Sequence, residues 1–231
     1  QLNYFTMKYL LSNIKININE KIYLKDPESS DLGKRIIENS IYLIDTIGFD
    51  GFTFKKLGEK IGSNESSIYR YFESKHMLLV YLTSWYWTWL EYQLVLSTNN
   101  IEDNKLKLEK AIAVLTQTTT IDSAFSHIDE VILKQIVINE YSKSYLTKEV
   151  DNENKEGYFA VYKRLVNRLK DMIVDVDVSY KYPLTLASTV IEGAMHQHFL
   201  KNHFQSITEC SQGLQPTDFF KDLVFNILTH K

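Results

Sequence analysis

Cysteine, proline and glycine are all scarce in this chain of 231 residues. It holds one cysteine, Cys210, together with three prolines and eight glycines. A single cysteine excludes a disulfide framework within the chain and a cysteine-rich zinc site, and it fits a reducing cytoplasm. We interpret Cys210 as a structural thiol rather than a nucleophile. The low glycine and proline content disfavours a turn-rich β-sandwich and favours long helices.

An excess of positive charge is also missing. The net charge is −3, so the overall charge gives no indication of nucleic-acid binding, although a local basic footprint stays possible. The first residues contain no small-residue cleavage site, and we expect no secretory leader. The segment Met77–Leu96 has the length of a membrane span, but it carries Glu91 and Gln93, and its tryptophans lie in its middle. We therefore predict a buried helix there, no membrane partner and a cytoplasmic protein.

Residues 1–30 are predicted to form an N-terminal arm. Isoleucines alternate with polar residues from Ile14 to Ile18, which is the pattern of a short strand, and Pro27 interrupts the structure after it. From there on, the spacing of apolar residues is typical of helices. The predicted helices are Leu32–Thr46, Phe54–Ile61, Glu65–Phe72, Lys75–Leu96, Ile101–Thr118, Asp129–Lys143, Asn152–Asp175, Pro183–Phe204 and Thr217–Thr229.

Turn and cap residues separate the first four of these helices. Gly48 and Gly62 are predicted to end the first and the second helix, because glycine is common just past a helix C-terminus. The N-cap of each helix is predicted to be a residue whose side chain accepts a bond from a free N–H of the first turn. These residues are Asp31, Thr53, Asn64 and Ser74.

Two very short helices lie between two long ones. Short isolated helices are marginal in water and persist when packed together, as they do in a helix-turn-helix. In that motif Phe54–Ile61 lies across the DNA backbone, and Glu65–Phe72 enters the major groove with its first residues at the base edges. Ile68 and Phe72 are four residues apart and are expected to face the core. We expect the polar side chains around them to be exposed.

The residue types in this stretch suit contact with DNA. Ser66 and Ser67 are small and can bond base edges or phosphates, and Arg70 can reach a guanine edge or a phosphate. Tyr69 and Tyr71 are expected to present their hydroxyls at phosphate distance. As alternatives, the tyrosines pack on the surface and the arginine pairs with a nearby glutamate. The ordered set favours DNA contact.

Two charged residues flank the exposed stretch. Lys75 stands in the first turn of the following helix, where free N–H groups and the helix dipole favour a phosphate. Glu65 either stabilises the helix N-terminus through the dipole or accepts a bond from a cytosine amino group, and we favour the first role. The predicted DNA-binding residues are Thr53, Asn64, Glu65, Ser66, Ser67, Tyr69, Arg70, Tyr71 and Lys75.

This region resembles the TetR family of transcriptional regulators over about Lys34 to Leu79, roughly a fifth of the chain. The matching residues are Gly48-Phe49, Thr53, Leu57, Ile61-Gly62, Ser67-Ile68-Tyr69, Tyr71-Phe72 and Ser74-Lys75. The resemblance implies an all-α fold with an N-terminal three-helix DNA-binding domain and a C-terminal helical bundle for dimerisation and ligand binding. It also implies a homodimer that binds a palindromic double-stranded DNA operator and is usually released by a small-molecule effector.

The chain departs from the family pattern in two respects. Asn64 and Ser63 stand where the family has serine and a small aliphatic residue. The segment Asp31–Val80 carries seven basic and seven acidic residues, so modest non-specific affinity is expected and a dimer would be needed for tight binding. We predict three parts: an arm at 1–30, a helix-turn-helix domain at 31–80, and an effector-binding and dimerisation domain at 81–231.

The C-terminal two thirds are rich in aromatic residues. The apolar arc of Pro183–Phe204 is too wide for burial on one side, which indicates a dimer interface. A pocket for an apolar or aromatic effector is predicted inside the bundle, although each wall residue is individually more typical of plain core. The candidate walls are Trp85, Trp89, Phe125, His127, Tyr141, Tyr158 and His196.

No catalytic, cofactor or metal motif accompanies these residues. His196 and His198 are two apart on a predicted helix and point in different directions, and His196 and His203 are about 10 Å apart, so neither pair is a metal chelate. We predict a non-enzymatic regulator without a cofactor, most consistent with a repressor. The alternatives are a regulator that answers to a protein partner or has no effector, and an enzyme built on a helical bundle.

Overall fold

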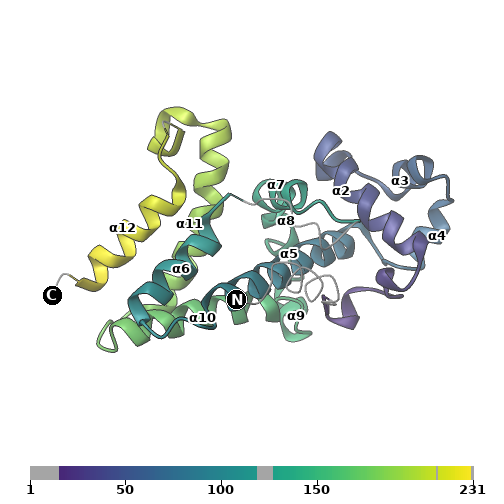
Figure 1. The fold of residues 1–231 in the computed structure, drawn as a ribbon. Helices are drawn as coiled ribbons and strands as arrows, with labels where there is room; N and C mark the ends of the chain where they lie inside the picture. Colours follow the sequence, from purple (N-terminus) through teal and green to yellow (C-terminus); the bar gives the residue numbers. More distant parts are fainter. Residues whose placement is uncertain (1–15, 119–126, 212, 230–231) are drawn as a thin grey trace, which may run out of the picture. The chain divides into compact units, whose positions relative to one another are not determined.

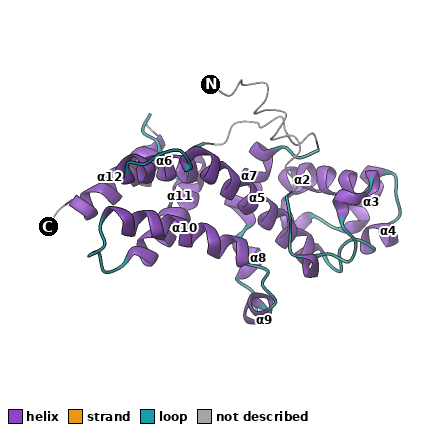
Figure 2. Ribbon diagram, turned by 60° about the horizontal axis from the view of Figure 1, so that its bottom comes forward, coloured by secondary structure: helices purple, strands orange, loops and turns teal. Residues whose placement is uncertain are grey.

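The computed structural model describes residues 16–118, 127–211 and 213–229, and every regular element in these ranges is helical (Figures 1 and 2). The all-α prediction is confirmed. The predicted strand at Ile14–Ile18 is wrong for its described part, because residues 16–19 are irregular and lead into a short 3₁₀ helix, η1 (Glu20–Ile22). Residues 14 and 15 lie outside the described ranges.

The chain divides into two compact units. The first unit consists of residues 1–88 and 119–159, and the second unit of residues 89–118 and 160–231. The division falls inside helix α5 (Lys75–Thr98), whose residues up to 88 belong to the first unit. Residues 127–159 group with the N-terminal helices, an association over long sequence separation that no local pattern indicates.

Three helices open the first unit, namely α2 (Asp31–Gly51), α3 (Phe54–Ile61) and α4 (Glu65–Tyr69), and they pack in sequence against one another (Figure 1). Their inward faces supply buried aliphatic side chains, as the helical spacing predicts. Helix α4 is shorter than predicted because the carbonyl of Ile68 accepts from the N–H groups of both Tyr71 and Phe72, which closes a turn instead of continuing the helix. The shared core contains Ile36, Ile37, Ile41, Ile44, Leu57, Ile68 and Phe72.

Side-chain caps start these helices, with one change from the prediction. Thr53 Oγ1 accepts from the Lys56 N–H at 3.2 Å, and Ser74 Oγ accepts from the Met77 N–H at 3.2 Å. The cap of α2 is Ser30 rather than Asp31, since its Oγ accepts from the Gly33 N–H.

The two predicted helix-ending glycines both have positive φ. Gly62 ends α3 in the left-handed conformation, with φ of 63°. Gly48 has φ of 71° and produces a kink rather than an end, because one further turn follows it to Gly51. A residue with a β-carbon rarely adopts either conformation, which accounts for glycine at both positions.

The rest of the first unit is formed by the start of α5 with α7 (Glu130–Glu140), α8 (Ser142–Tyr145) and α9 (Val150–Lys155). Helix α5 is buried around its whole circumference from Leu78 to Leu82, which is why its sequence resembles a membrane span. Within the described residues, however, no helix combines the length and apolarity needed to cross a bilayer. Helix α7 packs on α2, and η2 (Pro27–Ser29) packs on the first turn of α2.

The second unit contains α6 (Asn104–Thr116), α10 (Ala160–Val176), α11 (Pro183–His203) and α12 (Pro216–Thr229), with η3 (Gln205–Ile207) and η4 (Glu209–Ser211) joining the last two. Helices α6, α10 and α11 pack on one another, and α12 covers α6 and α11.

One predicted helix of this region is broken, and α11 approaches α12 closely at a glycine. The helix expected at Asn152–Asp175 is split into α9 and α10, because Gly157 between them has φ of 83°. A β-carbon at Gly193 would lie 2.7 Å from Cζ of the buried Phe220, so only glycine permits this approach of α11 to α12.

Candidate nucleic-acid interface

The start of α4 is organised by a single amide. Asn64 Oδ1 accepts from the backbone N–H of Ser67 at 2.9 Å, which is the helix cap. It also accepts from Ser66 Oγ at 2.8 Å and from Ser67 Oγ at 2.5 Å. Because each hydroxyl donates inward, its oxygen lone pairs are left to accept from outside. Asn64 therefore fixes the two serine hydroxyls as acceptors at the front of the helix.

The outer surface of α4 carries an exposed polar strip. Glu65, Ser66 and Arg70 are exposed, and Tyr69 is exposed over 47% of its surface. The Tyr69 ring meets the Phe54 ring edge to face, with centroids 4.9 Å apart, and this contact holds the ring against α3. No salt bridge of Arg70 with Glu65 or another acid is present among the described residues. The strip thus combines a guanidinium, a phenol and a hydroxyl.

Tyr71 does not belong to this strip, and the prediction that it is exposed is wrong. Its side chain is only 3% exposed, and its hydroxyl lies 2.8 Å from Ser30 Oγ. Lys25 Nζ stands 5.0 Å from the centre of its ring. The Ser30 hydrogen bond, against the effect of burial and with help from Lys25, holds the pKa of Tyr71 below its usual value. The arm covers this tyrosine, and the local sequence of the helix does not predict that cover.

Lys75 is also engaged within the chain. Its Nζ donates to the carbonyls of Phe49 at 3.0 Å, Phe52 at 3.2 Å and Asp50 at 3.3 Å. These carbonyls lie at the end of α2, where a lysine commonly satisfies them. An ammonium has three donors, so this arrangement occupies all of them. The position in the first turn of α5 is as predicted, but the side chain caps α2 instead of extending outward.

Two basic residues that the sequence interpretation passed over are exposed on α3. Lys55 and Lys60 are both exposed, whereas Lys56 donates to the Gly51 carbonyl at 2.7 Å. Thr53 is exposed as well, with its hydroxyl accepting the cap bond. Exposed lysines on the helix that crosses the DNA backbone are typical phosphate contacts. The buried Leu57 marks the inner face of α3, so the two lysines could have been assigned to its exposed face from the spacing alone.

The predicted effector residues in the first unit have contacts in different parts of that unit. Trp85 is buried in α5. The centroid of the Tyr141 ring lies 6.0 Å from that of Trp87 and 4.8 Å from that of Tyr145. His127 Nε2 lies 2.9 Å from Glu28 Oε1, and the Tyr158 hydroxyl donates to the Lys21 carbonyl at 3.2 Å. Phe125 lies outside the described residues.

In the second unit Trp89 is buried, but His196 is exposed and stacks with Phe199, which differs from the predicted pocket wall. His198 is the buried histidine of α11, and its Nε2 lies 2.8 Å from the Thr116 carbonyl. Within the described ranges no group of three or more histidine, cysteine or acidic side chains is placed to hold a metal ion.

Two cavities lie elsewhere, and none of the predicted effector residues lines them. A cavity of about 480 Å³ in the first unit lies between the arm and α5. A groove of about 520 Å³ in the second unit lies between the end of α11, the η3–η4 segment and α12. The groove exposes Ile207, Leu214 and Phe219 and reaches the buried Cys210, which is a free thiol. No sequence motif indicated either cavity, because each is lined by separate segments that carry no recognisable binding motif of their own.

Comparison with solved structures shows the fold of the chain. It is similar to AibR in complex with isovaleryl coenzyme A and operator DNA, with a TM-score of 0.56 and 16% identity over 84% of this chain and 97% of that one. It is similar to superantigen PfiT, with a TM-score of 0.59 and 14% identity over 90% and 100% of the two chains. It is also similar to the TetR family transcriptional regulator PfmR from Thermus thermophilus, with a TM-score of 0.50 and 15% identity over 85% and 100%.

Comparison with curated protein sequences found no match. A sequence model of a family, described as bacterial regulatory proteins of the tetR family, matches residues 36–82. This segment runs from the buried face of α2 through α3 and α4 into α5, and it includes the capped turn and the exposed strip described above. The likeness in sequence to bacterial regulatory proteins of the tetR family is therefore confined to this segment.

Proposed function

We propose that this chain is a transcriptional repressor that binds a palindromic operator as a homodimer and is released by a small, largely apolar effector. The single observation that supports DNA reading best is the exposed strip of α4. It presents the Tyr69 phenol, the Arg70 guanidinium and the Ser66 hydroxyl on and just after a helix that packs on α3 and whose Ile68 is buried. A short capped helix with exposed polar ends is suited to the major groove.

The residues that read DNA are proposed to differ in their roles. Arg70 is the candidate for a guanine edge, where a bidentate contact discriminates by about 1–3 kcal/mol. Lys55 and Lys60 on α3, together with the Tyr69 hydroxyl, are candidates for phosphates, which fix position without reading sequence. Glu65 occupies the first residue of α4, where its charge favours the helix N-terminus. Tyr71 and Lys75 are assigned supporting roles, because both side chains are engaged inside the first unit.

The experiment for this proposal is a mobility-shift titration with duplex DNA from upstream of the chain's own gene. Arg70→Ala is expected to weaken binding about tenfold or more, as the loss of a base-edge contact would. Lys105→Ala, which removes an exposed lysine from α6 in the second unit, is the matched control and is expected to bind as wild type does. Equal binding by wild type and Arg70→Ala would refute the assigned surface.

The homodimer is supported by exposed apolar side chains in the second unit. Several large hydrophobic residues of α11, α12 and the segment between them are about half exposed, among them Phe204, Leu214 and Phe219. Concentrated exposed apolar surface is typical of interaction sites. Phe219→Asp is expected to shift the mass measured by sedimentation from dimer towards monomer. Leu146→Asp, at an exposed leucine of the first unit, is the control and is expected to leave the mass unchanged.

The effector is supported by the aromatic interior and by precedent in fold. The first unit buries Trp85, Tyr86 and Trp87 on α5, and Tyr141 packs against Trp87. One structure of similar fold, AibR, holds isovaleryl coenzyme A and operator DNA together. Native mass spectrometry of the purified protein is expected to show a bound small molecule whose removal changes the affinity for DNA. A single unliganded mass, with no change in DNA affinity on denaturation and refolding, would favour a regulator without an effector.

A further inference from the structure

The described part of the arm from Asn19 to Ser30 is anchored at a point distant in sequence, after α9. Asn19 Nδ2 donates to the Glu156 carbonyl at 3.0 Å, and Lys21 Nζ lies 2.5 Å from Glu156 Oε2. The Tyr158 hydroxyl donates to the Lys21 carbonyl at 3.2 Å. Gly157 lies between these two partners, and a β-carbon there would be 3.4 Å from the Asn19 amide nitrogen. Glu156 and Tyr158, the residues on either side of Gly157, therefore hold Asn19 and Lys21 of the arm.

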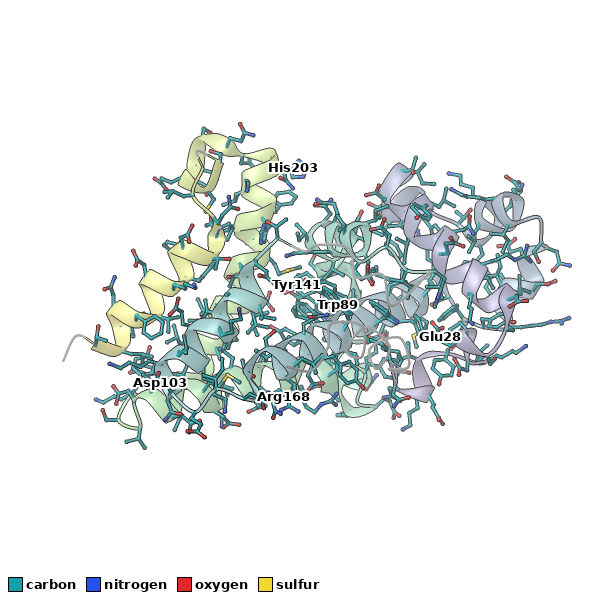
Figure 3. The ribbon with its side chains drawn as sticks, in the orientation of Figure 1. Glu28, Trp89, Asp103, Tyr141, Arg168 and His203 are labelled. Atoms are coloured by element: carbon teal, nitrogen blue, oxygen red, sulfur yellow. The ribbon has the colours of Figure 1, made fainter. Side chains whose placement is uncertain are left out.

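The middle of the arm is fixed against α2 and the residues before α7. Pro27 packs so closely on Gly33 that a β-carbon at position 33 would lie 2.1 Å from the Pro27 carbonyl oxygen. Glu28 extends from η2 to His127, with 2.9 Å between the carboxylate and ring nitrogen (Glu28 is labelled in Figure 3). Ile22, between these contacts and the first anchor, is almost completely buried. These contacts give the arm a defined path across the first unit.

Three residues of the arm, on either side of Pro27 and Glu28, hold Tyr71, which lies two residues after the end of α4. The Leu24 N–H donates to the Tyr71 carbonyl at 2.8 Å, and Ser30 Oγ bonds the Tyr71 hydroxyl at 2.8 Å. Lys25 lies over the same ring. One tyrosine is thus gripped at its backbone, at its ring face and at its hydroxyl by three residues of the arm.

We propose that the arm is a strap that positions α4 for DNA reading and transmits to it any change at Gly157 and Tyr158. Helix α4 has five residues, too few to be stable alone, so its geometry depends on what holds its ends. Asn64 holds its start, and the arm holds Tyr71 two residues after its end. The arm has a second anchor after α9, so a shift there changes the hold on Tyr71. Leu24 and Ser30 are positioning residues, and neither needs to touch DNA.

Hydrogen exchange of the free protein tests the grip on Tyr71 without any DNA. Tyr71→Phe keeps the buried ring and removes only the hydroxyl bonded to Ser30. We expect exchange of the amides in residues 65–72 and 22–30 to rise about two- to tenfold, which is the factor that one ordinary hydrogen bond represents. Tyr69→Phe is the matched control in the same helix and is expected to leave both segments unchanged. If Tyr71→Phe leaves exchange of residues 65–72 unchanged, or Tyr69→Phe raises it equally, the positioning role is wrong.

A second variant tests transmission from the far anchor. Tyr158→Phe removes the bond to the Lys21 carbonyl, and its local effect is expected at residues 16–24 and 150–160. Transmission predicts that exchange also rises in residues 65–72, and that the double variant with Tyr71→Phe shows less than the sum of the two single effects. Faster exchange confined to the anchor, or strictly additive effects, would refute transmission while leaving the proposed DNA binding untouched.

The DNA readout links the strap to the proposed function but fails separately from it. Tyr71→Phe and Tyr158→Phe leave every side chain of α4 unchanged, and both are expected to weaken operator binding several-fold. The dependence of binding on salt should stay the same, because no phosphate contact is lost. A loss that comes with a lower salt slope would mean that Tyr71 contacts a phosphate, which contradicts a positioning role. If wild type binds no DNA, the proposed function is wrong. The exchange experiments would still show whether the arm positions α4.

Discussion

Gly33→Ala is the sharpest test of how the arm is joined to the first unit. Gly33 lies in the first turn of α2, beneath η2. The added β-carbon would stand 2.1 Å from the oxygen, 2.6 Å from Cα and 2.7 Å from the carbonyl carbon of Pro27. All three atoms belong to the backbone, so no side-chain rotation relieves the overlap. Either α2 or the arm has to move.

The structure bounds the cost of that movement. Releasing the arm exposes Ile22, whose burial is worth about 1.5–3 kcal/mol. It also breaks the Leu24–Tyr71 and Ser30–Tyr71 hydrogen bonds, each worth about 0.5–1.5 kcal/mol. The variant is therefore expected to be less stable by about 2.5–6 kcal/mol, the sum of these contributions, because detachment of the arm limits the strain. At about 2–4 °C per kcal/mol for a chain of this length, the midpoint of thermal unfolding should fall by roughly 5–24 °C.

The matched control is Gly51→Ala at the other end of the same helix. There the added β-carbon would meet only Ile47, at ordinary contact distances of 3.7 Å and more. Alanine is also the better helix former by about 1 kcal/mol, so this variant is expected to match or exceed the wild-type midpoint. Circular dichroism measures the midpoints, and hydrogen exchange of residues 20–30 reports the arm. A Gly33→Ala midpoint equal to that of Gly51→Ala, with a protected arm, would refute the reasoning.

Three further predictions concern charge and backbone. Burial opposes ionisation of Glu91, but hydrogen bonds from Arg164 and Arg168 outweigh it and hold the pKa of Glu91 below its usual value. Glu91→Gln should therefore destabilise the chain by about 1–2 kcal/mol in urea at pH 7, and the difference from wild type should shrink as the pH falls below 4.5. Burial raises the pKa of Glu192 to about 6, so its contribution to stability is present below pH 4.5 and is lost as the pH rises through 6. Glu192→Gln should remove this pH dependence, and a urea titration from pH 4 to 7 with an unchanged slope would contradict it. Gly62→Ala forces a β-carbon into φ of 63° and should lower stability by about 1 kcal/mol, read as a lower thermal midpoint without loss of helix content.

Much of the structure of residues 31–80 could be predicted from the sequence because its determinants are local. A cap such as Thr53 or Asn64 bonds an N–H two or three residues later, and a helix-ending glycine such as Gly62 acts at its own φ. The apolar spacing that buries Ile68 against the core is likewise contained in one turn. Helix bounds in this segment therefore agree closely, except where Tyr71 and Phe72 leave the helix and where α2 continues past Gly48 to Gly51.

What the sequence by itself determined was the all-helical class, the capped helix-turn-helix and the resemblance of that segment to the tetR family. Only the tertiary structure decided that Tyr71 is buried beneath the arm and that the Lys75 ammonium is occupied by the end of α2. The physical reason is range. Helix periodicity and capping are set within about four residues, but the partners of Tyr71 lie more than 40 residues away in the arm, and those of the arm lie more than 130 residues further at Glu156. A polar residue that its own helix would leave exposed can be covered by a distant segment of the chain, and no local pattern shows which segment that is.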